Sequence, residues 1–386
     1  MKRFSGVFAL VADESAADQL IGLAFGNNQS ESSLPCQLVR SLTIWLLLQF
    51  VEGSNIPPME ESSKHHQPFR DELLIIDTDA GIDDAVAILT VLGDSEWSRK
   101  VTAITCVTGN TAVENVSTNV LKVLKIADRL EIPVYRGASQ GLVHETNTSN
   151  FFGEDGMGDV NYPEPPSDSL LQQEHAAVFL ANAVKQNPGS ITLLMMGPMT
   201  NVALAVRLNP KFMTQIGRIV SLAGAIAGGT KYDLKPAVEF NIYKDVEAAS
   251  VVLQEVSKAN KKPQFFTMLP AEPIVDNFLE MSWRKSVLGT LGSSFVDFLN
   301  RIEAVYLVDD LWTTFDLYTA AVLMRAPDTV AGYREVHVAV EVQGQLTRGR
   351  VVVDEYGVGG QPANVRLVTG LHRDSVKKIL MNNLHH

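Results

Sequence analysis

The sequence predicts an α/β fold: a Rossmann-like, mostly parallel sheet with helices on both faces and a C-terminal β hairpin. Apolar runs of strand length recur from residue 73 onward, and amphipathic helical patterns separate them. Strands that are apolar on both faces are typical of parallel sheets covered by helices. Near the end, residues 336–354 alternate between apolar and polar residues around a Gly-rich turn, which predicts the hairpin.

The expected elements follow one another along the chain. Strands are expected at 73–76, 101–107, 191–196, 219–223 and 265–269, and crossover helices at 112–129, 175–186 and 201–207. No G-x-G-x-x-G motif follows the first strand, so the sequence gives no support for a dinucleotide cofactor.

The chain divides into a leader with a linker, residues 1–70, and a catalytic domain, residues 71–386. Residues 60–70 are polar and suit a linker, because the periodic apolar patterns begin directly after them. Residues 41–51 are apolar and have the length of a signal-peptide core, but they lie far from the first residue. A secreted and a cytoplasmic protein are equally compatible with this pattern.

Composition excludes some classes of partner and of site. The 386 residues include 44 acidic and 32 basic ones, giving a net charge of −12, and no basic run is interleaved with aromatic residues. We therefore expect no binding to nucleic acid polymers. The two cysteines, Cys36 and Cys106, stand in unrelated contexts, so neither a disulfide framework nor a cysteine metal site is predicted.

The first expected strand ends in an acidic cluster, L-L-I-I-D-T-D-A-G-I-D-D, which contains Asp77, Asp79, Asp83 and Asp84. Ligands of open α/β sheets bind at the carboxyl ends of the strands, where this cluster would lie. Carboxylates this close repel one another, and a divalent cation would remove the conflict. Oxygen ligands without nearby His or Cys favour Ca²⁺ or Mg²⁺ over zinc.

The stretch D-T-D-A-G-I-D-D resembles the DxDPGxDD signature of the nucleoside hydrolases, with Ala80 in the place of the usual Pro. The resemblance continues in order through V-T-G-N (107–110), F-F-G-E-D-G-M-G (151–158), M-G-P-M-T-N-V-A (196–203), A-V-E-F-N-I-Y-K-D-V-E-A-A (237–249) and G-Q-L-T-R-G (344–349). Several ordered motifs together are more specific than one, and they span most of residues 73–370.

The resemblance implies a calcium-dependent hydrolase of ribonucleosides. It implies that Asp79, Asp84, Asp316 and the backbone carbonyl of Met196 hold Ca²⁺, and that Asp79 is the general base for the attacking water. Met196 replaces a frequent Thr, which a backbone ligand tolerates.

The resemblance also assigns the residues around the ribose. Those expected to contact it are Asp83, Asn110, Leu222, Glu239 and Asn241, with Asp83 and Asn110 also counted as catalytic and Asp77 placed just behind the site. If residues 239–241 are extended, the side chains of Glu239 and Asn241 face the same way and Phe240 faces the core. After a lengthened loop, Asp233 stands where the family has an Asn that contacts the 5′ hydroxyl.

Base preference follows from a departure from the family pattern. Members that accept pyrimidine nucleosides have a His directly before the late metal-binding Asp, whereas this chain has Phe315 before Asp316. The arrangement is similar to that of purine-preferring members, in which aromatic rings stack on the base. The candidates for stacking are Phe152, Trp312, Phe315 and Tyr318. His144 and His175 are weaker candidates for a replacement acid.

Two other functions stay open at this point. Asp77 and Asp79 could serve a Mg²⁺-dependent phosphohydrolase, with Asp77 as nucleophile, or the chain could bind nucleosides without turnover. The resemblance implies a small-molecule nucleoside as partner and a homodimer or homotetramer.

Overall fold

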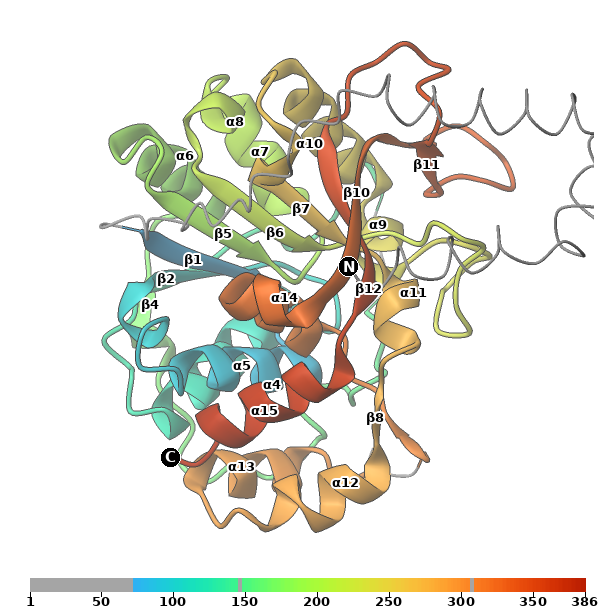
Figure 1. Cartoon of the computed structure of the whole chain (residues 1–386). Helices are drawn as coiled ribbons and strands as arrows, with labels where there is room; N and C mark the ends of the chain where they lie inside the picture. Colours follow the sequence, from blue (N-terminus) through green and yellow to red (C-terminus); the bar gives the residue numbers. More distant parts are fainter. Residues whose placement is uncertain (1–71, 145–147, 306–308) are drawn as a thin grey trace, which may run out of the picture. The chain divides into compact units, whose positions relative to one another are not determined.

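The computed structural model describes residues 72–386 except 145–147 and 306–308. The predicted leader and linker, with the apolar segment 41–51, lie outside the described residues. Figure 1 shows one twisted sheet with helices packed on both of its faces, which confirms the predicted fold class.

The sheet has ten strands among the described residues. In spatial order they are β11 (Val351–Asp354), β10 (Val330–Val340), β12 (Val365–Leu371), β7 (Phe266–Leu269), β6 (Arg218–Leu222), β5 (Ile191–Met195), β1 (Leu73–Thr78), β2 (Val101–Cys106), β3 (Val134–Arg136) and β4 (Leu171–Gln172).

The strands from β12 to β4 are parallel, and β10 is antiparallel to both β12 and β11. The chain runs outward from β1 through β2, β3 and β4, then returns to β5 on the other side of β1 and continues through β6 and β7. The strand order therefore reverses between β1 and β5, the position where open α/β sheets bind their ligands.

Alternate side chains of β1 pack into two separate apolar cores, one on each face of the sheet. Leu74 and Ile76 belong to one apolar cluster and Ile75 to the other, because successive side chains of a strand point to opposite faces. The helices on the first side are α4 (Ile82–Leu92), α5 (Val113–Ile126), α13 (Ser294–Ile302), α14 (Asp316–Thr329) and α15 (Arg373–Asn383). Those on the second are α6 (Ala176–Gln186), α7 (Thr200–Leu208), α8 (Phe212–Gln215) and α10 (Val246–Lys258).

Smaller elements follow the carboxyl ends of the strands. They are the helices α9 (Phe240–Lys244), α11 (Ala271–Val275) and α12 (Met281–Ser286), and the strand pair β8 (Leu279–Glu280) and β9 (Leu311–Trp312). Short 3₁₀ helices lie at Ser98–Lys100, Asp168–Leu170, Pro263–Phe265 and Leu288–Thr290.

The C-terminal hairpin is present as β10 and β11, which pair His337 with Asp354 and Val340 with Val351. It is joined to the parallel sheet by β12, which the sequence pattern did not reveal. The short strands β3 and β4 were also not anticipated, because two or three residues carry too little periodicity to be recognised.

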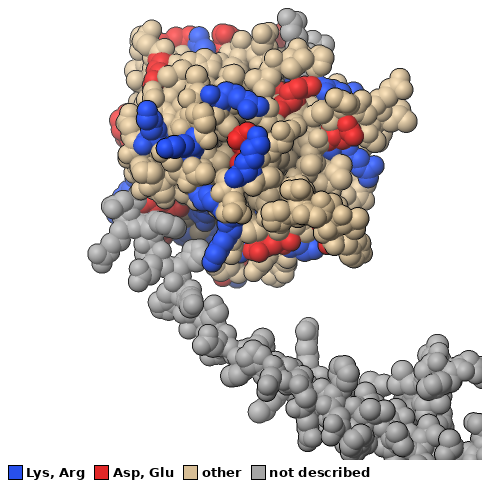
Figure 2. All heavy atoms as spheres, turned by 90° about the horizontal axis from the view of Figure 1, so that it is seen from above, with Lys and Arg blue, Asp and Glu red and all other residues tan. Residues whose placement is uncertain are grey.

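Three features of the surface, the helices and the core bear on the predicted class of protein. On the face shown in Figure 2, acidic and basic side chains lie among each other, separated by larger uncharged areas. Within the described ranges, no helix combines the length and apolar character needed to cross a membrane. The Cys106 thiol is buried in the sheet, as expected for a core residue.

Candidate active site

The acidic cluster lies at the carboxyl end of β1, where the chain turns into α4. Gly81 caps the helix, and its N–H donates to Asp84 Oδ2 at 2.8 Å. The Thr78 hydroxyl donates to the other oxygen of Asp84. Both Asp83 and Asp84 therefore occupy the first turn of α4, where the helix dipole favours negative charge.

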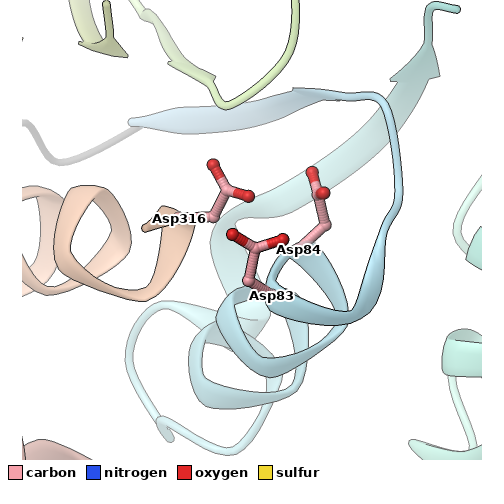
Figure 3. Close-up of side chains that lie close together, drawn as sticks. All are labelled: Asp83, Asp84 and Asp316. Atoms are coloured by element: carbon pink, nitrogen blue, oxygen red, sulfur yellow. The ribbon is translucent and has the colours of Figure 1, made fainter. Parts of the chain in front are cut away.

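A third carboxylate joins them from a distant part of the chain. Asp316 is the first residue of α14, and α14 packs against α4. One oxygen from each of Asp83, Asp84 and Asp316 lies within 4.8 Å of the others, and Figure 3 shows the three carboxylates gathered between the two helix starts. The predicted meeting of Asp84 with Asp316 is thus present.

Burial makes this cluster electrostatically costly. Desolvation, followed by repulsion from Asp84, raises the pKa of Asp83 to about 7. The same two causes, in the same order, raise the pKa values of Asp79 and Asp316 well above their usual range. Buried like charges need a compensating partner.

The donor set fits a hard divalent cation. Asp83 Oδ1 and Asp316 Oδ1 are buried and accept no hydrogen bond. Buried acceptors without a partner cost free energy unless a cation or another donor satisfies them. Carboxylate oxygens are the ligands that Ca²⁺ and Mg²⁺ prefer, so the cluster is a candidate metal site for either ion.

Asp79 lies beside the three-carboxylate cluster and is held by the loop after β2. The backbone N–H of Asn110 donates to Asp79 Oδ2 at 2.8 Å, and Asn110 Nδ2 donates to Asp84 Oδ2 at 3.3 Å. A Cβ at Gly109 would lie 2.0 Å from Asp79 Oδ2, so only glycine permits this approach. The V-T-G-N motif therefore positions both expected catalytic residues, Asp79 and Asn110.

The E-F-N motif has a different conformation from the extended one expected. Glu239 caps α9, and its carboxylate accepts hydrogen bonds from the N–H groups of Asn241 and Ile242, at 2.7 and 3.2 Å. Phe240 accordingly does not face the core but lines the central cavity. The helix-capping role of a carboxylate at this position outweighs the strand-like pattern of the residues.

Glu239 and Asn241 both line the cavity nevertheless. Asn241 Nδ2 donates to the carbonyl oxygen of Met196 at 2.6 Å, which places that expected backbone ligand next to the ribose candidates. The backbone N–H of Gly224 donates to Glu239 at 2.9 Å, and burial raises the pKa of Glu239 to about 7.

Asp77 lies behind the residues that line the cavity and is not itself part of the lining. It is fully buried, and Asp77 Oδ2 accepts hydrogen bonds from the Thr105 hydroxyl at 2.5 Å and from Asn201 Nδ2 at 2.9 Å. Desolvation raises its pKa to about 7. Asn201, which the sequence did not single out, also receives the N–H of Ala138 at 2.9 Å; its signal was the M-T-N motif.

The central cavity has a volume of about 400 Å³. Its lining includes most of the expected residues: Asp79, Asp83, Asn110, Met196, Leu222, Glu239, Asn241, Asp316, Phe152 and Phe315. The structure thus brings together side chains from segments separated by more than two hundred residues of sequence.

Two of the four aromatic candidates lie elsewhere. Trp312 lines a smaller neighbouring cavity, and its Nε1–H donates to Glu303 at 3.0 Å. Tyr318 has no exposed surface, and its hydroxyl donates to the carbonyl of Asn277. Tyr318 does not line the cavity, so it cannot stack on a base there.

The two histidine candidates are exposed and do not line the cavity. His175 caps α6 by accepting the N–H of Ala177, and His144 lies in the segment between β3 and β4. Asp233 does line the cavity, but its carboxylate accepts the N–H and the hydroxyl of Thr230, at 3.0 and 2.9 Å.

Sequence reasoning missed several lining residues, among them Lys231, Tyr232 and Thr313. It also missed Lys244, which is buried; burial lowers its pKa, and the attraction of Asp79 opposes that shift. Lys231 and Tyr232 lie in a loop without periodicity, so no pattern pointed to them.

Comparison with known proteins gives one consistent family. Residues 74–378 match the family model described as inosine-uridine preferring nucleoside hydrolase. The chain is 33% identical to the pyrimidine-specific ribonucleoside hydrolase RihA of Salmonella typhimurium, over 81% of this chain and 98% of that protein.

Solved structures agree with the sequence relatives. An inosine-guanosine nucleoside hydrolase superposes with a TM-score of 0.74 at 30% identity, covering 82% of this chain and 99% of the other. A purine-preferring ribonucleoside hydrolase from Gardnerella vaginalis gives a TM-score of 0.69 at 25% identity, covering 81% and 98%.

Proposed function

This chain belongs to the inosine-uridine preferring nucleoside hydrolase family, and we propose that it is a calcium-dependent hydrolase of purine ribonucleosides. Family membership makes it a hydrolase that acts on the N-glycosyl bonds of ribonucleosides. The choice of purine, the identity of the ion and the roles of single residues are our inference.

Ribose binding is assigned to the acidic end of the cavity. Asp83 and Asn241 offer a carboxylate and an amide to the 2′ and 3′ hydroxyls, Asn110 assists, and Glu239 receives the 5′ hydroxyl. Leu222 packs against the sugar. Their common lining of one cavity supports this assignment. Hydroxyl groups are both donors and acceptors, so carboxylates and amides suit them.

We propose that Ca²⁺ is held by Asp79, Asp84, Asp316 and the Met196 carbonyl. Asp83 lies close to Asp84 and Asp316 and offers a further oxygen. Bound calcium would supply positive charge that lowers the pKa of water and accommodates ribose oxygens, since it accepts six to eight oxygen ligands. The unpartnered oxygens of Asp83 and Asp316 support an ion at this place.

Asp79 is proposed to take the proton of the attacking water. The water oxygen bonds to C1′ of the ribose, and the bond from C1′ to the base nitrogen breaks with its electron pair moving to the base. The surrounding carboxylates stabilise the positive charge that develops on the sugar. Asn110 keeps one oxygen of Asp79 occupied through its N–H, so the other oxygen is the one available for the proton.

The purine preference is proposed from the aromatic part of the cavity lining, around Phe152 and Phe315, which we call the base end. Phe315, rather than His, precedes Asp316, and Phe152 lies with it in the lining; among the described lining residues there is no histidine. Aromatic rings stack on flat bases. The departing base then takes its proton from solvent. The names of the relatives divide between pyrimidine and purine nucleosides, so they do not decide the preference.

The alternative function, a phosphohydrolase, needs Asp77 as an accessible nucleophile, and Asp77 is not accessible from the cavity. Asp77 is fully buried, is engaged by Thr105 and Asn201, and does not line the cavity. An in-line attack from this position would need the carboxylate to leave its hydrogen bonds and enter the cavity.

The test measures release of base and ribose from inosine, guanosine, adenosine, uridine and cytidine, with Ca²⁺, with Mg²⁺ and with EDTA. We expect purine turnover that depends on calcium. Faster turnover of uridine would contradict the purine preference, and turnover in EDTA would contradict the metal. A homodimer or homotetramer also stays a prediction, which the molar mass from light scattering checks.

A further inference from the structure

The loop between β6 and α9 brings a basic side chain to a cavity that is otherwise lined with acidic, amide, hydroxyl, aromatic and apolar residues. Of the described residues in the lining, Lys231 is the one with a positively charged side chain. It is exposed and therefore lies where the cavity opens to solvent.

The first half of this loop is fixed to α11. Glu272 Oε1 accepts hydrogen bonds from the backbone N–H groups of Ile226, Ala227 and Gly229, at 2.6, 2.7 and 3.3 Å. Three donors on one carboxylate oxygen hold the backbone before Lys231 in one conformation.

The second half is fixed by a local turn. The carboxylate of Asp233 accepts the N–H and the hydroxyl of Thr230, and the N–H of Tyr232 donates to the Thr230 hydroxyl oxygen at 3.1 Å. Asp233 is therefore occupied within the loop. Lys231, Tyr232 and Leu234 are the other residues of this loop that line the cavity, and of these three only Lys231 carries a charge.

Tyr232 places the loop at the base end of the cavity. Its ring packs edge-on against Phe315, with centroids 5.7 Å apart, and against Phe278, at 5.6 Å. Its hydroxyl lies 3.4 Å from the Thr313 hydroxyl, and Lys231 Nζ lies 4.9 Å from the centroid of its ring. Lys231 is thus next to the packed rings of Tyr232, Phe278 and Phe315, which we call the aromatic wall.

We propose that Lys231 is a specificity-determining residue that recognises an oxo group on the base, and that Tyr232 holds it against the aromatic wall. An ammonium group has three donors and no acceptor. A 6-oxopurine presents two acceptors, O6 and N7, on one edge, whereas adenine presents N7 beside an amino donor. Lys231 therefore favours inosine and guanosine over adenosine.

This proposal rests on the proposed function, and its test uses Lys231→Met with Lys235→Met as matched control. Lys235 lies in the same loop and is exposed, but it does not line the cavity. The full-length protein and each variant are assayed with inosine, guanosine and adenosine. A fourth substrate, 4-nitrophenyl β-D-ribofuranoside, has the sugar but no purine edge, so its turnover reports the sugar end alone.

We expect Lys231→Met to lower kcat/KM for inosine and guanosine by roughly 10- to 100-fold, as for a lost hydrogen bond to a charged donor. Adenosine and the nitrophenyl riboside should change by less than about 3-fold, and Lys231→Arg should restore most of the inosine activity because it keeps the donors. Lys235→Met should leave all four substrates unchanged.

An equal loss for adenosine and inosine, or no loss for inosine, overturns the role of Lys231. If instead the proposed purine preference is wrong, the protein without substitutions prefers pyrimidine nucleosides. In that case uridine, which carries an oxo group at C4, and cytidine, which carries an amino group, replace inosine and adenosine, and a Lys231→Met effect confined to uridine supports the proposal.

Discussion

The two ends of the cavity are built from different kinds of structure. The proposed sugar end is formed by the end of β1 and the first turns of α4, α9 and α14. Its carboxylates are buried, and all but that of Asp316 accept a hydrogen bond from a backbone N–H group. The base end is formed by loop residues such as Phe152, Tyr232 and Phe315. Positions on element ends are fixed by the core, whereas loop residues change without disturbing it. Under the proposed function, the chemistry is therefore set at one end and the choice of base at the other.

The largest effect is expected at the sugar end from Asp79→Asn. Removing a general base should lower kcat for inosine by about 10²- to 10⁴-fold. Asp328→Asn, at an exposed position of α14, is the matched control and should leave kcat unchanged. Steady-state rates at saturating calcium check this, and a loss of only a few-fold would remove Asp79 from the role of base.

Asp316→Asn should next separate metal binding from folding. We expect the affinity for Ca²⁺ to fall by about 10-fold or more, because a carboxylate ligand is lost. The metal-free variant should nevertheless melt at a higher temperature than the metal-free parent, since repulsion within a buried acidic cluster is relieved. Titration calorimetry and melting curves with EDTA measure both. A lower Tm in EDTA together with unchanged calcium affinity would contradict the ion site.

At the base end, Phe315→Leu should lower kcat/KM for inosine by about 5- to 100-fold, since base stacking on an aromatic ring contributes about 1–3 kcal/mol. Turnover of the nitrophenyl riboside should stay nearly constant, which distinguishes lost stacking from a disturbed sugar end. Tyr318→Phe serves as control because Tyr318 is buried outside the cavity. If Phe315→Leu slows both substrates equally, the division between the two ends does not hold.

The smallest effect is expected from Leu222→Met, which exchanges side chains of similar volume against the sugar. Such exchanges cost less than about 1.5 kcal/mol, so kcat/KM should change by a factor of about ten at most. Because Leu222 lines the cavity without a polar contact, all nucleosides should respond alike. A base-dependent change would show that Leu222 belongs to the base end.

The sequence by itself determined the fold class, the acidic end of β1 and most of the residues that line the cavity next to it. These features are local: a buried strand ending in D-T-D-A-G-I-D-D fixes where Asp79, Asp83 and Asp84 lie through the backbone of one strand and one helix turn. The ordered family motifs extended this to Asn110, Glu239 and Asn241.

Only the tertiary structure decided which aromatic rings reach the cavity and which basic residue meets them. Phe315 lines the cavity because it precedes the first residue of α14, whereas Tyr318, three residues later, lies inside the helix and is fully covered by the core. Lys231 and Tyr232 belong to a loop whose course depends on Glu272, forty residues away in sequence. Contacts between segments that distant leave no local pattern, so packing rather than periodicity sets the base end.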